Sequence, residues 1–284
     1  MKYKVEVFNN NKHILGEGAF YDPRYEVTSW IDIVVKKLYI IDKYNKLKEV
    51  EFKEKIGAAL PLKRSNGYVV CAENNLYLYE NNEIKVLKSL KGITDGTNRC
   101  NDAKADPFGR LWFSTIVDDG LHSPSSVLYC YTNNEIIKMD DDLKLGNGMA
   151  WNKDKNKFYL ADSAAHKIYS YDYDIDTGYI SNRKVLAELY DATPDGMTID
   201  NKDNLIIAIW DGARIEVRSS KAGILKDTIN MPTNLITSAA FMDNNLDTLL
   251  ITSAKLDRTD EFAGVVFKVK TNYKGVNPNY VVIE

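Results

Sequence analysis

The stretch ADPFGRLWFST (105–115) joins a polar turn to a short apolar strand, and this pattern recurs along the chain. The turn Asp106-Pro107-Phe108-Gly109 precedes the strand core Leu111-Trp112-Phe113. Five similar cores begin 30 to 47 residues from their neighbours, at Leu38, Tyr68, Phe158, Leu205 and Leu249. A second apolar strand follows each core, and no stretch keeps the spacing of an amphipathic helix. The pattern predicts a nearly all-β chain of six repeats.

Six units of about 40 to 50 residues, each with several antiparallel strands, predict a six-bladed β-propeller. A two-sheet sandwich is the alternative for 284 residues, but it does not explain the regular period. Propeller rings commonly close by pairing strands from the two termini, which removes long unpaired edges. We expect Tyr3 to Phe8 to pair with Asn279 to Ile283 in the last blade, so that residues 1–284 form one domain.

Composition limits the class of protein. The chain has 37 Lys and Arg against 40 Asp and Glu, a formal net charge of −3, so a basic nucleic-acid surface is not expected. Hydrophobic residues make up 44% and charged residues 27%, which is typical of globular domains. No apolar run approaches the roughly 18 residues of a membrane helix, and the N-terminal stretch MKYKVEVFNNN does not resemble a signal peptide. We expect a cytoplasmic protein without a nucleic-acid or membrane partner.

The three cysteines suggest no chemistry. Cys71, Cys100 and Cys130 are too widely spaced for a C-x-x-C motif, and their odd number argues against a disulfide framework. We interpret them as buried, inert thiols. The chain also lacks G-x-S-x-G, P-loop and G-x-G-x-x-G motifs, so serine hydrolase and nucleotide-binding readings have no support.

Polar residues stand out on the predicted inner strands of four repeats. Alone, Glu17, Asn147 and Asp195 would each fit an ordinary turn, and Arg99 would fit a surface ion pair. Equivalent positions of different blades converge on the central channel of a propeller, so together these residues predict a common site. The residues are Glu17 in GEGAFYD, Arg99 and Asn101 in RCND, Asn147 in GNGMAW, and Asp195 in PDGMTID.

These segments resemble the family of regucalcin (senescence marker protein), gluconolactonase and luciferin-regenerating proteins. The resemblance covers essentially the whole chain, with its segments in the family order. It rests on GEGAFYDPR (16–24), the strand Trp30–Ile33, RCNDAKADPFGRLWFSTI (99–116), NGMAW with YLADS (147–163), PDGMTID (194–200), and TSAAF with LLITSA (237–254). The resemblance implies a six-bladed propeller with a divalent cation in its channel.

The resemblance also implies roles for single residues. Glu17, Asn147 and Asp195 match the family's metal ligands, an all-oxygen set that suits Ca²⁺, Mg²⁺ or Mn²⁺ and leaves Zn²⁺ open. Three protein ligands leave positions for water and substrate, as in a catalytic metal site. Arg99 and Asn101 match the pair that contacts the substrate, and both can bind sugar hydroxyls.

The sequence departs from the family in two places. Some members place a carboxylate in a long loop that covers the substrate, but the loop 117–126 has no Glu near its end. His122 is an alternative substrate contact there, although an exposed loop histidine is the simpler interpretation. Ala19 replaces a residue that is usually proline, and we expect only a local backbone effect.

We therefore expect a divalent-metal-dependent lactonase that opens a sugar-acid lactone, with Asp195 as both ligand and general base. One alternative is a hydrolase of another ester class, such as organophosphate esters. The other is a non-catalytic, metal-responsive, calcium-binding regulatory protein. The sequence does not identify the physiological lactone, the native metal, protein partners or the oligomeric state.

Overall fold

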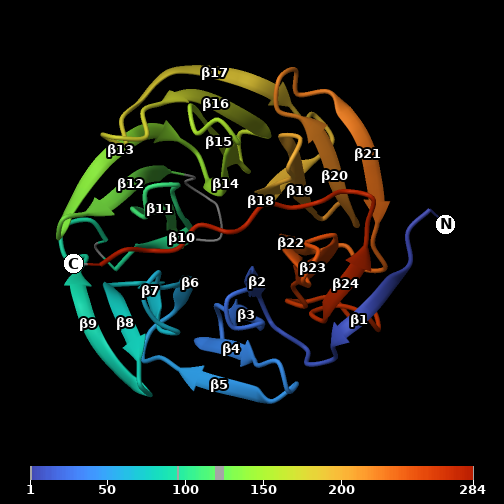
Figure 1. The fold of residues 1–284 in the computed structure, drawn as a ribbon, viewed down its shortest axis with the longest axis horizontal. Helices are drawn as coiled ribbons and strands as arrows, with labels where there is room; N and C mark the ends of the chain where they lie inside the picture. The colour runs from blue at the N-terminus through green and yellow to red at the C-terminus, as the bar shows by residue number, and fades with distance from the viewer. Residues whose placement is uncertain (1, 95, 119–124, 284) are drawn as a thin grey trace.

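The computed structural model describes residues 2–94, 96–118 and 125–283. Within these ranges the chain forms 24 strands and no α-helix. None of the described residues belongs to a helix that could span a membrane. The strands make six sheets of four strands each, arranged in a ring (Figure 1). The predicted six-bladed β-propeller is confirmed.

Each of the first five blades uses four consecutive strands, with the first strand innermost in the ring (Figure 1). Blade one contains β2 (Gly16–Asp22), β3 (Val27–Asp32), β4 (Lys37–Ile41) and β5 (Leu47–Glu51). Blade two contains β6 (Ile56–Pro61), β7 (Tyr68–Ala72), β8 (Asn75–Glu80) and β9 (Glu83–Ser89). Blade three contains β10 (Asn98–Ala105), β11 (Leu111–Val117), β12 (Ser126–Thr132) and β13 (Glu135–Leu143).

The remaining blades follow the same order until the ring closes. Blade four contains β14 (Gly146–Trp151), β15 (Lys157–Asp162), β16 (Lys167–Tyr173) and β17 (Ile180–Glu188). Blade five contains β18 (Thr193–Ile199), β19 (Asn204–Trp210), β20 (Arg214–Ser219) and β21 (Leu225–Asn230). Blade six contains β22 (Ile236–Met242), β23 (Thr248–Ser253), β24 (Val266–Lys270) and β1 (Val5–Asn9).

The ring closes where β1 pairs antiparallel with β24, with Val5 opposite Val269. Our expectation that Asn279 to Ile283 would supply this partner is wrong. β24 is the next strand after β23 along the chain, and most of its residues are buried between β23 and β1, so it takes the closing position before the chain reaches Asn279. Residues 274–283, which we call the C-terminal strap, instead cross one face of the ring, and Val281 bridges to Leu62 beside blade two (Figure 1).

Apolar packing joins neighbouring blades around the ring. The six inner strands contact one another in the circular order β2, β6, β10, β14, β18, β22 and back to β2. The glycines of the N-G and D-G pairs lie within strands, where these contacts are closest. A Cβ on Gly148 would lie 2.5 Å from the Asp195 carbonyl oxygen, and one on Gly196 would lie 2.7 Å from the Thr237 carbonyl oxygen. Glycine is therefore needed there for close strand approach.

Candidate active site at one end of the ring axis

Each inner strand has one irregularity in its pairing with the second strand of its blade. The shifts fall within 17–20, 56–58, 100–103, 146–149, 194–197 and 236–238. A β-bulge redirects side chains and is common beside active sites. Four of these segments contain Glu17, Asn101, Asn147 and Asp195, and Arg99 lies just before one of them. The equivalent segments of blades two and six contain Gly57 and Thr237. The candidate side chains are therefore at one level around the ring axis, which we call the site end.

Asp195 is the most constrained of the predicted metal ligands. Asp195 is only 5% exposed, and its Oδ1 is buried without a hydrogen-bond partner among the described residues. Burial and then the charge of Asp102 raise its pKa well above the ordinary value, although hydrogen bonds from Asn147 and the Gly196 backbone oppose this shift. A buried carboxylate with an unsatisfied oxygen is costly unless a cation or proton compensates it.

Glu17 is electrostatically linked to Asp195 across the ring. Burial, followed by the charges of Asp195 and Asp102, raises the pKa of Glu17 well above its usual range. The Gly18 backbone N–H donates to Glu17 Oε2 at 3.1 Å, and this bond and the charge of Arg99 oppose the shift. The structure thus brings two predicted ligands close enough for mutual repulsion.

Asn147, the third predicted ligand, is fixed by blade four. It is 8% exposed, and its Nδ2 donates to Ser163 Oγ at 3.1 Å. Ser163 in turn donates to the Pro194 carbonyl oxygen at 2.6 Å, next to Asp195. This chain of hydrogen bonds joins β14 to β18 and orients the amide beside Asp195.

The predicted substrate-binding pair lies on β10. Arg99 is 6% exposed, and its Nη1 donates to the Cys100 carbonyl oxygen at 2.9 Å. Asn101 is partly buried, and its Nδ2 donates to the Gly146 carbonyl oxygen at 3.1 Å. Arg99 Nη1 also donates to Asn101 Oδ1, at 3.4 Å. Both side chains are thus held at the site end, and Asn101 directly precedes Asp102.

Two further charged residues lie on the same strand. Burial raises the pKa of Asp102, and the charge of Lys104 opposes this shift. Lys104 Nζ crosses the axis and donates to the Met197 carbonyl oxygen of β18. Neither residue is among the site residues that we selected from the sequence. The sequence did contain a signal for both residues, because two charged residues alternate with alanines in the segment 102–105.

The donor set fits a hard divalent cation. Two carboxylates and an amide supply oxygen ligands only, which suits Ca²⁺, Mg²⁺ or Mn²⁺. The buried, unpartnered oxygen of Asp195 and its repulsion with Glu17 are both relieved by a positive charge at this position. Within the described ranges no cluster of three or more His, Cys, Asp or Glu could hold a metal. The predicted ligand set combines two carboxylates with the Asn147 amide.

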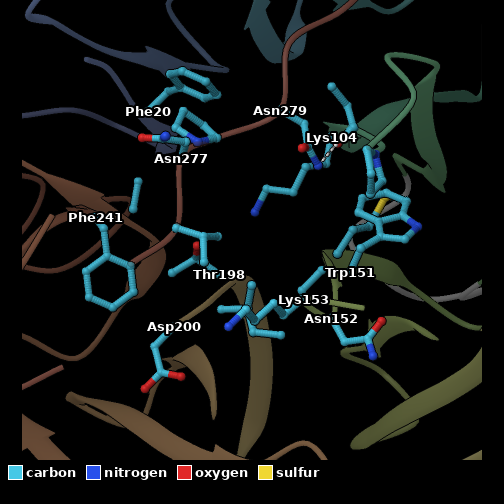
Figure 2. A pocket seen from close by; sticks show the side chains of 18 of the residues that line it. Phe20, Lys104, Trp151, Asn152, Lys153, Thr198, Asp200, Phe241, Asn277 and Asn279 are labelled. Atoms are coloured by element: carbon cyan, nitrogen blue, oxygen red, sulfur yellow. Dashed lines mark hydrogen bonds between the residues drawn. The ribbon is translucent and has the colours of Figure 1, made fainter. Parts of the chain in front are cut away.

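A separate cavity of about 260 Å³ lies at the opposite end of the inner strands. Phe20, Trp151 and Thr198 line it, together with Asn277 and Asn279 of the C-terminal strap (Figure 2). None of the five predicted site residues contributes to its lining. The loop residue His122 lies outside the described residues, so its proposed substrate contact stays a prediction.

Sequence relatives resemble the chain over nearly its whole length. A protein of Sulfolobus acidocaldarius without an assigned activity is 32% identical over 282 residues, which span 97% of this chain and 98% of that protein. YvrE of Bacillus subtilis, described as a candidate sugar lactone lactonase, is 28% identical over 280 residues, which span 95% of each chain.

Solved structures share the same fold. A luciferin-regenerating enzyme is 29% identical, with a TM-score of 0.93, and the match covers 99% of this chain and 100% of that chain. Regucalcin of Agrobacterium tumefaciens, a calcium-binding protein, is 19% identical with a TM-score of 0.91, and the match covers 99% of this chain and 98% of that chain. At this lower identity the likeness shows the fold alone.

The family assignment comes from the matched segment. A family model described as the SMP-30/gluconolactonase/LRE-like region matches residues 15–255. This range includes all six inner strands and every predicted site residue. The family model and the description of the Bacillus relative together support a hydrolase that acts on sugar lactones. The chain belongs to the SMP-30/gluconolactonase/LRE-like family.

Proposed function

We propose that this protein is a divalent-metal-dependent lactonase, built as one propeller domain, that hydrolyses a sugar-acid lactone. The observation that carries the proposal is the buried Asp195 carboxylate, whose Oδ1 lacks a hydrogen-bond partner among the described residues. A bound cation would also offset the repulsion between this carboxylate and Glu17. Arg99 and Asn101 lie at the same end of the axis, with groups suited to bind hydroxyls. Family membership supports this activity.

Glu17, Asn147 and Asp195 would hold Ca²⁺, Mg²⁺, Mn²⁺ or Zn²⁺. When bound, the cation supplies the positive charge that keeps both carboxyl groups ionised and polarises the lactone carbonyl. Ser163 fixes the Asn147 amide through its hydrogen bond at 3.1 Å.

The reaction breaks the acyl–oxygen bond of the ring. Arg99 and Asn101 bind and orient the lactone, and the Asp195 carboxylate accepts a proton from the attacking water. Water oxygen bonds to the carbonyl carbon, the bond to the ring oxygen breaks, and the ring oxygen receives a proton. The product is the open hydroxy acid, which is released as its anion with a proton.

The test is a pH-indicator assay on metal-stripped protein. A panel of aldonolactones is offered while Ca²⁺, Mg²⁺, Mn²⁺ or Zn²⁺ is restored one at a time. We expect metal-dependent acid release, and we expect Asp195→Ala to lower kcat at least a hundredfold while the circular dichroism spectrum is kept. Near-normal turnover by this variant would contradict the role of Asp195.

A calcium-binding protein without catalysis is the second candidate. Regucalcin of Agrobacterium tumefaciens is described as a calcium-binding protein, and its fold matches this chain. Calorimetry on the same preparation separates the candidates. Cation binding without hydrolysis of any lactone or organophosphate ester would favour the second candidate, whereas turnover of organophosphate esters alone would indicate the other ester class.

A further inference from the structure

A group of three charged side chains lies at the rim of the candidate site. Lys55 Nζ donates to Asp118 Oδ2, and Arg99 Nε lies 3.7 Å from the same oxygen. Lys55 precedes the inner strand of blade two, whereas Arg99 and Asp118 belong to blade three. We call these three residues the rim triad.

The backbone fixes Asp118 in place. It follows the last residue of β11, and its N–H donates to the Thr97 carbonyl oxygen at 2.9 Å, just before β10. On the other side, the Lys55 carbonyl oxygen accepts from the Glu73 N–H at 3.0 Å. The Asp118 side chain is 33% exposed and that of Lys55 is 37% exposed, so both are accessible to solvent.

Arg99 is the buried member of the triad. Its side chain is only 7% exposed, and its Nε has no hydrogen-bond partner among the described residues. At 3.7 Å the contact with Asp118 is an ion pair and too long for a hydrogen bond. Asp118 therefore holds the guanidinium electrostatically while its Nε–H stays available as a donor.

The charges at the rim are nearly balanced among the residues that the structure describes. Lys55 and Arg99 carry two positive charges against one on Asp118, and the charges of Glu17 and Glu73 also act on Arg99. Burial raises the pKa of Asp118, but the hydrogen bond from Lys55 and the charge of Arg99 outweigh this and lower it. Asp118 is consequently anionic at neutral pH and reduces the attraction of the rim for an anionic substrate.

We propose that Asp118 is a specificity-determining residue, which positions Arg99 and makes the site prefer neutral, hydroxyl-bearing lactones over lactones that carry a free carboxylate. This inference rests on the proposed lactonase function. Lys55 has the opposite effect on this preference, because its positive charge attracts a carboxylate and Asp118 offsets that charge.

The test compares two variants that change the rim charge in opposite directions. Asp118→Asn keeps the shape and removes one negative charge, so we expect kcat/KM for a carboxylate-bearing lactone to rise about fivefold relative to a neutral aldonolactone. Lys55→Met removes one positive charge, so we expect the same ratio to fall about fivefold. The change should lie mainly in KM. Asp141→Asn is the matched control, because Asp141 pairs with Lys138 at 2.6 Å on the outer strand β13.

The specificity ratio distinguishes a charge effect from loss of structure. A variant that only disturbs folding lowers both activities together and leaves the ratio unchanged. An unchanged ratio, or a shift in the same direction for Asp118→Asn and Lys55→Met, would overturn the inference.

A second measurement does not depend on turnover. The Nε–H signal of Arg99 in ¹⁵N NMR is assigned by its loss in Arg99→Lys. We expect this signal to shift and to exchange faster with water in Asp118→Asn, but not in Asp141→Asn. If wild-type protein hydrolyses no lactone, the proposed function fails, whereas an unchanged Arg99 signal in Asp118→Asn overturns the positioning role itself.

Discussion

Single carboxylates dominate the energetics of the site end. Asp195, Glu17 and Asp102 are buried or partly buried on three different blades, and each has a raised pKa. Arg99 and Lys104 supply compensating charge on the same strand as Asp102. A buried charge without a compensating partner lowers the free energy of unfolding. We therefore expect the site without a bound metal to reduce the stability of the protein.

The variant Asp195→Asn tests whether charge repulsion lowers the stability of the metal-free protein. The amide keeps the shape of the side chain but removes one of the mutually repelling charges. We expect the metal-free variant to be more stable than wild type by about 1 to 3 kcal/mol in urea unfolding with chelator. We also expect added Ca²⁺ to stabilise wild type but not the variant. Lower stability in chelator together with an unchanged calcium response would refute this account.

At the scale of elements, the bulges of the inner strands decide where the site residues point. β14 and β18 touch at Gly148, where a Cβ would meet the Met197 nitrogen at 2.4 Å and the Asp195 carbonyl oxygen at 2.5 Å. Both neighbouring atoms belong to backbone, so the two blades have to separate to admit a side chain.

Gly148→Ala should therefore lower the free energy of unfolding by about 2 to 4 kcal/mol and weaken cation binding, because it displaces Asp195. Gly92→Ala is the comparison, since Gly92 has a φ of +87° but nothing within 4 Å of its Cβ position. We expect only about 1 kcal/mol there, from backbone strain. Equal losses in urea unfolding would show that close strand approach is not the cause.

At the scale of the whole molecule, the C-terminal strap links blades that are far apart around the ring. Val281 is 1% exposed and exchanges backbone hydrogen bonds with Pro61 and Lys63, while the Val282 N–H donates to Gly109. Tyr280 donates to Asp22 at 3.0 Å. The strap thus anchors to blades one, two and three after leaving blade six.

Val281→Ala should destabilise the protein by about 1 to 3 kcal/mol, because it leaves a cavity under the strap. Val276→Ala is the matched control in the same segment, since Val276 is 39% exposed. Its expected effect is below about 0.5 kcal/mol. Urea unfolding measures both, and a similar small loss in each would mean that the strap contributes little.

Repeated strand cores allowed the fold to be predicted. The recurrence of cores such as Leu111-Trp112-Phe113 and Phe158-Tyr159-Leu160 reports local β preference and burial, which depend on neighbours in sequence. The strap was assigned wrongly because Asn279 to Ile283 also has the pattern of a terminal strand. Its place across the ring depends on contacts with Leu62 and Gly109, which lie more than 150 residues earlier.

The sequence was enough to predict the β-propeller, the family resemblance and the polar residues that open four inner strands. The pairs of charges that face one another, such as Asp195 with Glu17 and Lys55 with Asp118, became known only from the folded ring. Strand patterns arise from the alternation of adjacent side chains, whereas electrostatic energies depend on distance and burial across the ring. Those quantities exist only after the blades have closed around their axis.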